Sequence, residues 1–479
     1  MRMAPRAAPP PALLKRLAER LGPRGYTEDQ AAIAPWLTDW RGRYTGASMA
    51  MLSPADTAET VAIVAACAEA GVALVPQGGN TSMVAGATPP ADGSALLLSL
   101  RRLDRIRALS IEDNVVVAEA GVVLEALHQA AEAAGRRFPL SLAAKGSATV
   151  GGLVSTNAGG TQVLRFGPMR ALLLGIEAVL PDGSLFEGLS ALRKDNRGYD
   201  LRQLLAGAEG TLGIVTAASL RLVPAAGTRA VAWVGLDRPD AALALLRLLE
   251  ARLGEAIESF EIVPAEGLAL VLAHIAGARA PLAGAHRWHV LIEATAPQAG
   301  ADLAERLEAA LGVALADGLA SDAAIATSEA QADALWRLRE SMSEAERKDG
   351  MAAKHDVSVP VSAMPRFLDA AKAAVEARFP GTRVLAFGHL GDGNVHFNVR
   401  APAGADDRAW LAAEGEAVSA FVHDLVAAEG GSLSAEHGIG QLKRAEFART
   451  ADRPRLAALR AIKGALDPLG LLNPGKLLP

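Results

Sequence analysis

Residues 53–79 read SPADTAETVAIVAACAEAGVALVPQGG, and they decide the fold class of the N-terminal part of the chain. The stretch predicts a helix followed by a strand: Ser53 can cap the helix, Pro54 suits its first turn, and Gly71 suits its end. The strand that follows ends at Val75 and leads directly into a pair of glycines. A helix and a buried strand joined in this way form an α/β unit.

Later apolar runs extend this pattern along the chain. Leu172 to Leu180 and Gly213 to Leu222 predict two more buried strands, and the turn at residues 181–183 closes the first of them. Beyond Pro224 the pattern changes to strands that alternate with amphipathic helices, beginning with a strand at Val231–Gly235. Further elements are expected at Ala241–Leu253, Trp288–Glu293, Ala301–Leu311, Ala363–Arg378 and Trp410–Ala428, all of them helices except the second.

The chain is therefore expected to be an α+β protein of three parts. Its 479 residues are enough for two or three domains that each bury a core. The first part covers residues 1–224 and consists of an N-terminal arm and two α/β subdomains. The second part covers residues 225–428. The third part, residues 429–479, is small and mostly helical.

Composition and charge exclude several classes of protein. Hydrophobic residues make up 51% of the chain and charged residues 21%, as in ordinary folded proteins. Lys plus Arg number 48 against 53 Asp plus Glu, a net charge of −5 without a long block of one sign, so we expect no nucleic-acid partner. No apolar run approaches the ~18 residues of a membrane span, so we expect no integral membrane segment.

Cysteine usage gives no support to an oxidising compartment. The single cysteine, Cys67, lies in the first predicted helix, where we expect it to fill the core. One cysteine permits no intramolecular disulfide. The first twelve residues contain no apolar stretch of the kind found in secretory signals. The expected location is therefore the cytoplasm.

A glycine-rich loop, PQGGNTS at residues 76–82, follows the first predicted strand. Adjacent glycines let the backbone approach a ligand closely, and consecutive N–H groups there can form a nest for a phosphate. An ordinary tight turn would look the same. The loop is not the G-x-G-x-x-G fingerprint, which removes the main support for a Rossmann enzyme that uses nicotinamide.

Two more segments rich in small residues could contact a ligand. Residues 145–160 offer glycines and hydroxyls over sixteen positions, and a structureless loop of that length is unusual unless it wraps something. Ala208 to Thr216 enters a strand and offers backbone donors and acceptors to a flat ring. We favour ligand contact for the first segment over a plain connector, whereas the second is a weak signal by itself.

The motif HLGDGNVH places His389 and His396 seven residues apart. On one extended strand an odd separation would put them on opposite faces, so a turn must lie between them. Residues 391–394, GDGN, are strong turn formers, and a chain that folds back here would bring both imidazoles to one point, as a metal site needs. Two ligands alone do not hold a divalent ion.

A carboxylate stands beside an imidazole at Glu436-His437. Adjacent residues on a strand point to opposite sides, so one of the pair could reach the histidine site while the other faces a substrate. His389, His396 and Glu436 would then make a three-ligand site for zinc or another divalent first-row metal. His437 becomes a candidate general base, since imidazole titrates near neutral pH. The alternative is a hydrogen-bonded structural histidine.

Cationic residues in the central part of the chain favour an anionic substrate. Arg339 and Ser343 are four apart in a predicted helix and share one face, and Lys354 begins a predicted strand. Arginine offers a bidentate fork for a carboxylate, and lysine offers a second positive charge. Each of these residues taken alone is more often a solvated surface group.

Seven motifs in this order resemble the FAD-linked oxidase superfamily named for vanillyl-alcohol oxidase and p-cresol methylhydroxylase. They are PQGGNTSMVAG, KGSATVGGLVSTNAGG, GAEGTLGIVT, KHDVSVPVS, GHLGDGNVHFNV, AEHGIGQLKR and NPGK, spread over roughly Asp39 to Leu478. Within the superfamily the chain is similar to bacterial D-2-hydroxyglutarate dehydrogenases, with D-lactate dehydrogenases and the glycolate oxidase flavin subunit as close relatives.

The resemblance implies functions for the three predicted parts. Residues 1–224 would form a two-part FAD-binding domain of the p-cresol methylhydroxylase type (PCMH-type), and residues 225–428 a substrate domain with an antiparallel sheet. Residues 429–479 would return to the flavin. FAD would be bound noncovalently, because the flavin loop offers no His or Cys for a covalent link. The residues implied to contact FAD are Pro76, Gln77, Gly78, Gly79, Asn80, Thr81, Ser82, Gly146, Ser147, Thr149, Gly151, Gly152, Thr156, Asn157, Glu209, Gly210, Ile214 and Asn473.

The resemblance also implies a reaction: oxidation of a D-2-hydroxy acid, best D-2-hydroxyglutarate, to the 2-keto acid by hydride transfer to flavin N5, with metal assistance. The implied zinc ligands are His389, His396 and Glu436, the implied base is His437, and the implied substrate contacts are Arg339, Ser343, Lys354 and Asn398. The alternatives are a shorter acid such as D-lactate or glycolate, and a flavin transferase like alkyl-glycerolphosphate synthase. An electron-transfer flavoprotein or quinone-linked partner is expected from the relatives, and a homodimer by base rate.

Overall fold

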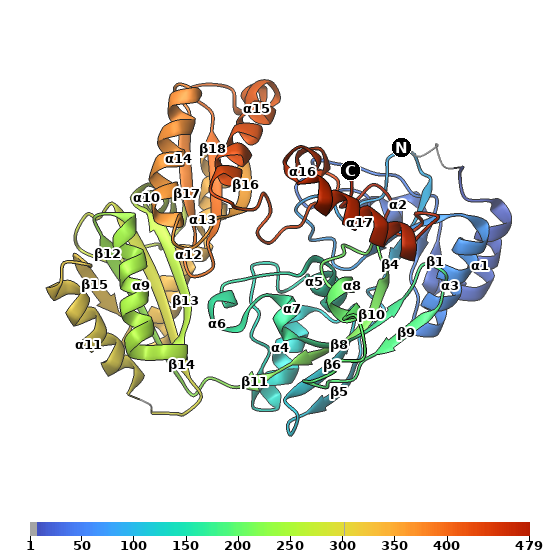
Figure 1. Cartoon of the computed structure of the whole chain (residues 1–479), viewed down its shortest axis with the longest axis horizontal. Helices are drawn as coiled ribbons and strands as arrows, with labels where there is room; N and C mark the ends of the chain where they lie inside the picture. The colour runs from blue at the N-terminus through green and yellow to red at the C-terminus, as the bar shows by residue number, and fades with distance from the viewer. Residues whose placement is uncertain (1–6, 301) are drawn as a thin grey trace. The chain divides into compact units, whose positions relative to one another are not determined.

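The structure is a computed structural model that describes residues 7–300 and 302–479. The chain forms two compact units, which we describe one at a time. Among the described residues, unit 1 is made of residues 7–158, 168–224 and 436–479, so it draws on both ends of the chain. Unit 2 is made of residues 159–167 and 225–435, and most of it is coloured from lime to orange in Figure 1.

Unit 1 contains two main sheets and a short two-stranded pair. In spatial order the first sheet has β1 (Tyr26–Thr27), β2 (Met51–Leu52), β4 (Ala95–Ser99) and β3 (Ala73–Gln77), and the second has β5 (Ile106–Ser110), β6 (Val115–Glu119), β10 (Ile214–Arg221), β8 (Leu173–Val179) and β9 (Leu185–Gly188). The pair is β11 (Val223–Pro224) and β7 (Arg136–Arg137). Both pairs that involve β4 are parallel, whereas every pair in the second sheet is antiparallel.

The helices of unit 1 come from both ends of the sequence. They are α1 (Pro11–Gly25), α2 (Gln30–Ile33), the 3-10 helix η1 (Ala34–Trp36), α3 (Thr57–Ala70), α4 (Leu124–Ala133), α5 (Val150–Thr156), α7 (Met169–Leu172), α8 (Leu201–Leu205), α16 (Arg444–Thr450) and α17 (Arg453–Leu466). Buried side chains of α1, α3, β3 and β4 form one hydrophobic core.

The predicted helix–strand unit is present, but its first residue differs. Helix α3 starts at Thr57, and its N-cap is Asp56, whose carboxylate accepts from the backbone N–H of Glu59 at 2.8 Å. Ser53 was the wrong cap, because the carboxylate of Glu59 accepts in turn from Ala55 N–H and completes a reciprocal cap around Asp56. Gly71 ends the helix as predicted, with φ of 66° in the left-handed region that favours glycine.

Cys67 fills the core of unit 1, as the sequence predicted, with 1% of its surface exposed. Burial raises the pKa of its thiol to about 12. At pH 8 a thiol with that pKa is about one part in 10⁴ thiolate, the form that reacts. We therefore expect no labelling of the native protein by Ellman's reagent and one labelled thiol per chain after unfolding in guanidinium. Rapid labelling of the native protein would show that this core opens readily.

Unit 2 is built on a seven-stranded sheet in which every neighbouring pair is antiparallel. Its strands, in spatial order, are β15 (Asp322–Ile325), β12 (Thr228–Leu236), β14 (Trp288–Ala296), β13 (Ile257–Pro264), β17 (Arg383–His389), β18 (Asn394–Arg400) and β16 (Ala352–Ser358). Its helices are α6 (Val163–Phe166), α9 (Pro239–Leu253), η2 (Gly254–Ala256), α10 (Ala265–His274), α11 (Leu303–Ala316), α12 (Glu329–Glu340), α13 (Met342–Asp349), α14 (Met364–Arg378) and α15 (Asp407–Ala428).

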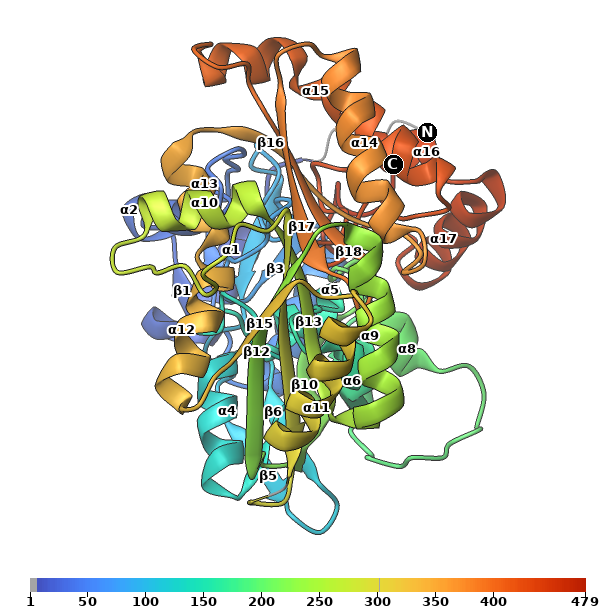
Figure 2. The same ribbon diagram turned by 90° about the vertical axis from the view of Figure 1, so that its left-hand side faces the viewer.

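Alternate residues of these strands serve opposite faces of the sheet. On one face Val234, Ile262 and Phe397 pack with helices α9, α11, α14 and α15. On the other face Trp233 and Phe387 pack with α10, α12 and α13. Figure 2 shows this sandwich, with α9 and α11 on one side of the strands and α12 on the other. The mixed α and β architecture and the antiparallel sheet are therefore confirmed.

Candidate functional site

The two histidines of the HLGDGNVH motif lie on one face of the unit 2 sheet. Strands β17 and β18 pair antiparallel, with His389 opposite Asn394 and Phe387 opposite His396. The chain turns through residues 390–393 between them, as the odd spacing of the histidines predicted. The ring centroids of His389 and His396 are 5.4 Å apart. The hairpin thus brings two potential ligands to one point.

A carboxylate and a third imidazole follow at the end of unit 2. The backbone N–H of Ala435, the last residue of the unit, donates to the carbonyl oxygen of Asp356 in β16 at 3.3 Å, and Glu436 comes next. His389, His396 and Glu436 each offer one ligand atom, and these atoms all lie within 4.8 Å of one another. Asp356, Glu436 and His437 form a second group by the same criterion.

Residues 434–438 form a loop, so the expectation that Glu436 and His437 lie on a strand is wrong. Gly438 has φ of 78°, a left-handed conformation that lies outside the range of a regular strand.

The imidazole nitrogens of His389 and His396 and the carboxylate oxygen of Glu436 suit zinc or another first-row ion. The donor set of the described residues therefore fits a divalent metal.

A glutamate that the sequence did not single out holds part of this site. Glu261 in β13 is fully buried, and one carboxylate oxygen lies 2.6 Å from Nδ1 of His389. The other oxygen accepts from Nε of Arg339 at 2.9 Å. Burial acts to raise the pKa of this carboxyl, but attraction to His389 and Arg339 outweighs it and holds the pKa below its ordinary value. The only signal in the sequence was the presence of two charged residues, Glu258 and Glu261, within an otherwise apolar strand.

A second buried glutamate connects two other predicted residues. Glu346 in α13 is fully buried, and one carboxylate oxygen accepts from Nζ of Lys354 at 2.6 Å and from Nδ2 of Asn398 at 3.0 Å. Lys354 and Asn398 are opposite each other in the pairing of β16 with β18. Three of the four predicted substrate contacts, Arg339, Lys354 and Asn398, are thus held by buried carboxylates on one face of the sheet.

Ser343 is placed differently from its predicted neighbour. The expected single helix divides at Ser341, so that Arg339 belongs to α12 and Ser343 to α13. Arg339 is 8% exposed, whereas Ser343 is exposed. The expectation that the two residues share one continuous helix face is therefore wrong, and a substrate role for Ser343 stays a prediction.

In unit 1 the loop at residues 76–82 lies directly against the second glycine-rich segment. A Cβ atom added at Gly79 would stand 1.8 Å from the carbonyl oxygen of Ser147, and one at Gly78 would stand 2.1 Å from Oγ1 of Thr149. Both contacts are shorter than real Cβ atoms make, and at Gly79 the neighbouring atoms are backbone, so glycine is required there. The two segments that were implied to bind FAD are thus in contact.

The same loop has the features of an anion-binding site. Within the described residues, no backbone N–H from Gly78 to Ser82 donates a hydrogen bond. Asn80 adopts the left-handed φ of 55°, which turns successive N–H groups toward one side. Two buried side-chain atoms nearby, Gln77 Oε1 and Thr149 Oγ1, also have no hydrogen-bond partner. The free N–H donors and the Thr149 hydroxyl, which can also donate, fit the pyrophosphate of a dinucleotide.

Residues of the C-terminal segment complete unit 1. The side-chain amide of Asn473 donates to the carbonyl oxygens of Gly86 and Glu209, at 2.9 and 2.6 Å. The Glu209 carboxylate accepts from the N–H groups of Ile439 and Gly440, both at 2.7 Å, so this side chain holds the loop that follows His437. Burial raises the pKa of Glu209.

The remaining implied flavin contacts belong to α5, to residues beside it or to the start of β10. Thr156 donates through Oγ1 to the carbonyl oxygen of Gly152, and Asn157 ends α5 with φ of 49°. Burial lowers the pKa of Lys476 to about 7, with Arg444 acting in the same direction. The structure therefore gathers the predicted flavin motifs, while their individual contacts stay predictions.

Replacing Gly79 with alanine should strip the protein of FAD. The new Cβ would clash with the backbone carbonyl carbon and oxygen of Ser147. Either the loop at residues 76–82 or the segment at Ser147 must therefore move. We expect FAD affinity to fall at least about tenfold, or about 1.4 kcal/mol. Flavin absorbance per chain after gel filtration measures it. Gly464→Ala, in a helix with nothing within 4 Å of the added Cβ, is the matched control and should keep its FAD. Full flavin content in Gly79→Ala would contradict the assignment of this loop.

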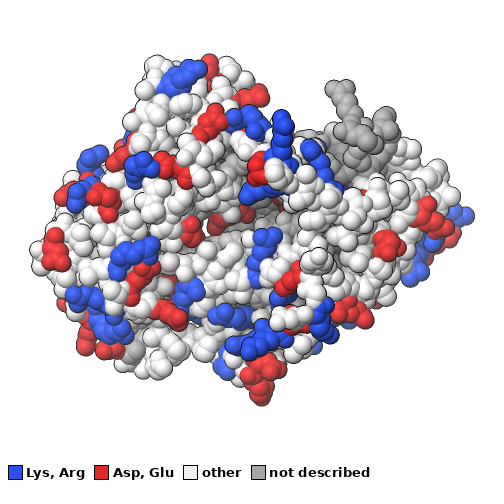
Figure 3. Space-filling model, in the orientation of Figure 1, with Lys and Arg blue, Asp and Glu red and all other residues white. Residues whose placement is uncertain are grey.

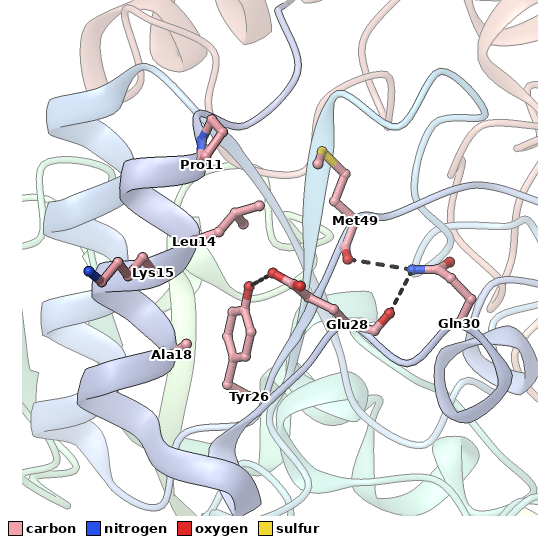
Figure 4. Close-up of a pocket in the computed structure, with 8 residues that line it drawn as sticks. All are labelled: Pro11, Leu14, Lys15, Ala18, Tyr26, Glu28, Gln30 and Met49. Atoms are coloured by element: carbon pink, nitrogen blue, oxygen red, sulfur yellow. Dashed lines mark hydrogen bonds between the residues drawn. The ribbon is translucent and has the colours of Figure 1, made fainter.

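Other surface features lie away from these residues. A pocket of about 630 Å³ in unit 1 is shown in Figure 4, and its lining is Pro11, Leu14, Lys15, Ala18, Tyr26, Glu28, Gln30 and Met49. None of the predicted site residues is among them. On the face shown in Figure 3, basic and acidic residues are intermixed without a broad field of one sign. Among the described residues, no helix has the length and apolar character needed to cross a bilayer.

Comparison with known proteins places these features in one class. Residues 49–188 match the model of an FAD binding domain, and residues 226–477 match that of the C-terminal domain of FAD linked oxidases. p-Cresol methylhydroxylase with substrate bound has a similar fold, with a TM-score of 0.74 and 16% identity over 97% of this chain and 96% of that one. Fold and site together define an FAD-dependent oxidoreductase with a PCMH-type flavin domain.

Sequence relatives narrow the class. Mitochondrial D-2-hydroxyglutarate dehydrogenase of Bos taurus is 38% identical over 96% of this chain and 82% of the relative. D-2-hydroxyglutarate dehydrogenase of Xanthomonas citri pv. viticola is 39% identical over 92% of this chain and 91% of the relative. The chain belongs to the FAD-linked oxidase family, as its motifs suggested.

Proposed function

We propose that this protein is an FAD-dependent, metal-assisted dehydrogenase that oxidises a D-2-hydroxy acid, best D-2-hydroxyglutarate, to the 2-keto acid. The relatives named D-2-hydroxyglutarate dehydrogenase support the substrate class. The observation that carries the proposal is the sheet face of unit 2. There His389 and His396, two of the three proposed ligands, stand on the same surface as Arg339, Lys354 and Asn398.

The bound groups supply the chemistry that amino acids lack. FAD would accept the hydrogen of C2 with its electron pair, and a divalent ion held by His389, His396 and Glu436 would polarise the hydroxyl. The chain supplies the rest. His437 follows Glu436 directly and would take the hydroxyl proton as general base.

The cations would hold the carboxylates of the substrate. Glu261 pairs with one edge of the Arg339 guanidinium, through Nε at 2.9 Å and Nη2 at 2.8 Å, and a guanidinium carries further N–H donors on its opposite edge. A carboxylate of the substrate can therefore bind there without displacing Glu261. Lys354 keeps donors beyond its bond to Glu346 because an ammonium has three. Two separate cations favour a substrate with two carboxylates.

The setting of the reaction is proposed from the sequence and from the resemblance to FAD-linked oxidases. Electrons would leave the reduced flavin for an electron-transfer flavoprotein or a quinone-linked protein, since the chain has one cysteine and cannot ligate an iron–sulfur cluster alone. We propose a cytoplasmic location and a homodimer.

A substrate panel tests the proposal. Under anaerobic conditions the wild type should be bleached at 450 nm by D-2-hydroxyglutarate faster than by D-lactate or glycolate. Arg339→Ala should raise KM for the diacid by one to two orders of magnitude and change the short acids less, because they lack the distal carboxylate. Preference for D-lactate in the wild type would shift the assignment to a short-acid dehydrogenase. No reduction by any 2-hydroxy acid would reject it.

A further inference from the structure

Two fully buried glutamates stand out on the site face of unit 2. Glu261 and Glu346 each have 0% exposure, and glutamate is almost never buried to this extent unless it is paired. Each one binds two predicted site residues that come from different elements. Burying a charged carboxylate away from water costs free energy. A fully buried and paired glutamate therefore indicates a role in positioning its partners.

The two oxygens of Glu261 serve different parts of the site. Oε1 lies 2.6 Å from Nδ1 of His389, its partner in the pairing of β13 with β17. Oε2 accepts from Nε of Arg339 at 2.9 Å and lies 2.8 Å from its Nη2. One rigid carboxylate therefore lies between a metal-ligand candidate and the arginine that would bind the substrate.

Each bond has a chemical consequence. When His389 donates its Nδ1–H to Glu261, the ring tautomer is fixed and Nε2 carries the lone pair that a metal needs. The bond to Nε of Arg339 sets the plane of the guanidinium, which also lies over the ring of Phe387 at 4.9 Å. The remaining guanidinium donors are then aimed in one direction.

We propose that Glu261 is a positioning residue that couples the metal site to the substrate-carboxylate site. Its single carboxylate fixes the metal-binding tautomer of His389 and the orientation of Arg339 at the same time. Glu346 has a narrower role, because its contacts, Lys354 and Asn398, are both on the substrate side. This inference rests on the proposed function. It adds Glu261, which the proposed function does not itself use.

The chain provides a matched control on the same face of the sheet. Glu293 in β14 is 8% exposed, and its carboxylate accepts from Nε of Arg229 at 2.7 Å and from Nε1 of Trp336 at 2.6 Å. Neither partner is a candidate site residue. Glutamine in place of each glutamate keeps the shape and removes one charge, so Glu261→Gln, Glu346→Gln and Glu293→Gln can be compared directly.

The test measures zinc affinity by competition with a chromophoric chelator, and kcat and KM with D-2-hydroxyglutarate at saturating zinc. Glu261→Gln should bind zinc about 10- to 100-fold more weakly and should also show a raised KM. Glu346→Gln should raise KM and keep zinc affinity within about twofold. Glu293→Gln should change neither. Thermal melting and flavin content show that each variant is folded, and Glu261→Asp, which is too short to reach both partners, substitutes if Glu261→Gln fails to fold.

Wild-type zinc affinity in folded Glu261→Gln or Glu261→Asp would overturn the inference. Equal weakening of zinc binding in Glu346→Gln would do the same, because the coupling would then not belong to Glu261. Failure of the proposed function looks different: the wild type itself would bind no zinc or would not be reduced by D-2-hydroxyglutarate.

Discussion

Replacing His437 with alanine should slow reduction of the flavin by D-2-hydroxyglutarate about 10²- to 10⁴-fold, the usual contribution of a general base. The loop that carries His437 is held by two hydrogen bonds that do not involve its side chain. The backbone N–H groups of Ile439 and Gly440 donate to the buried carboxylate of Glu209. Alanine at 437 leaves those bonds in place. The variant should therefore keep its FAD and its fold while it loses the proton acceptor.

Anaerobic stopped-flow absorbance at 450 nm measures this rate. His274→Ala is the matched control, because His274 is a histidine at the end of α10 whose ring pairs with Asp349 outside the candidate site. It should reduce at the wild-type rate. An His437→Ala protein that is reduced as fast as the wild type would remove His437 from the mechanism and leave it a structural histidine.

Removal of the metal should abolish substrate-driven reduction and leave the flavin in place. Lewis-acid stabilisation of a developing oxyanion is worth several kcal/mol, which corresponds to a loss of about 10³-fold or more. None of the proposed ligands His389, His396 and Glu436 is among the residues implied to bind FAD. A chelator should thus affect one site without the other.

Dialysis against dipicolinate followed by zinc titration measures this effect. Activity should return with one zinc per chain, and His396→Ala should stay inactive after zinc is added. Dithionite is the control, because it should still reduce the bound flavin in the metal-free protein. Full substrate-driven reduction in a sample shown to be metal-free would rule out metal assistance.

The sequence was sufficient wherever a local rule determines the structure. The odd spacing of His389 and His396 requires a turn, and residues 391–394 supply it, so the hairpin followed from chain geometry alone. The loop at residues 76–82 follows from adjacent glycines after a strand. Each of these features involves neighbours within about ten residues, where turn chemistry and strand alternation apply.

Other features depended on contacts between distant segments and were missed. Glu261 contacts His389, which lies 128 positions later in the sequence, on a neighbouring strand. No local pattern around Glu261 predicts this contact. The segment at 145–160 was expected to be structureless but contains α5. Its glycines permit close packing: a Cβ at Gly151 would stand 2.7 Å from Cβ of Ala120. The glycines of this segment predicted a loop. In the structure they instead allow helix α5 to pack closely against the chain at Ala120.

The most direct test of the account is one anaerobic titration of the purified holoprotein with the two enantiomers of 2-hydroxyglutarate. One equivalent of the D-enantiomer should bleach one equivalent of flavin and yield one equivalent of the 2-keto acid, while the L-enantiomer should leave the spectrum unchanged. Bleaching by both enantiomers alike, or product without reduced flavin, would contradict it.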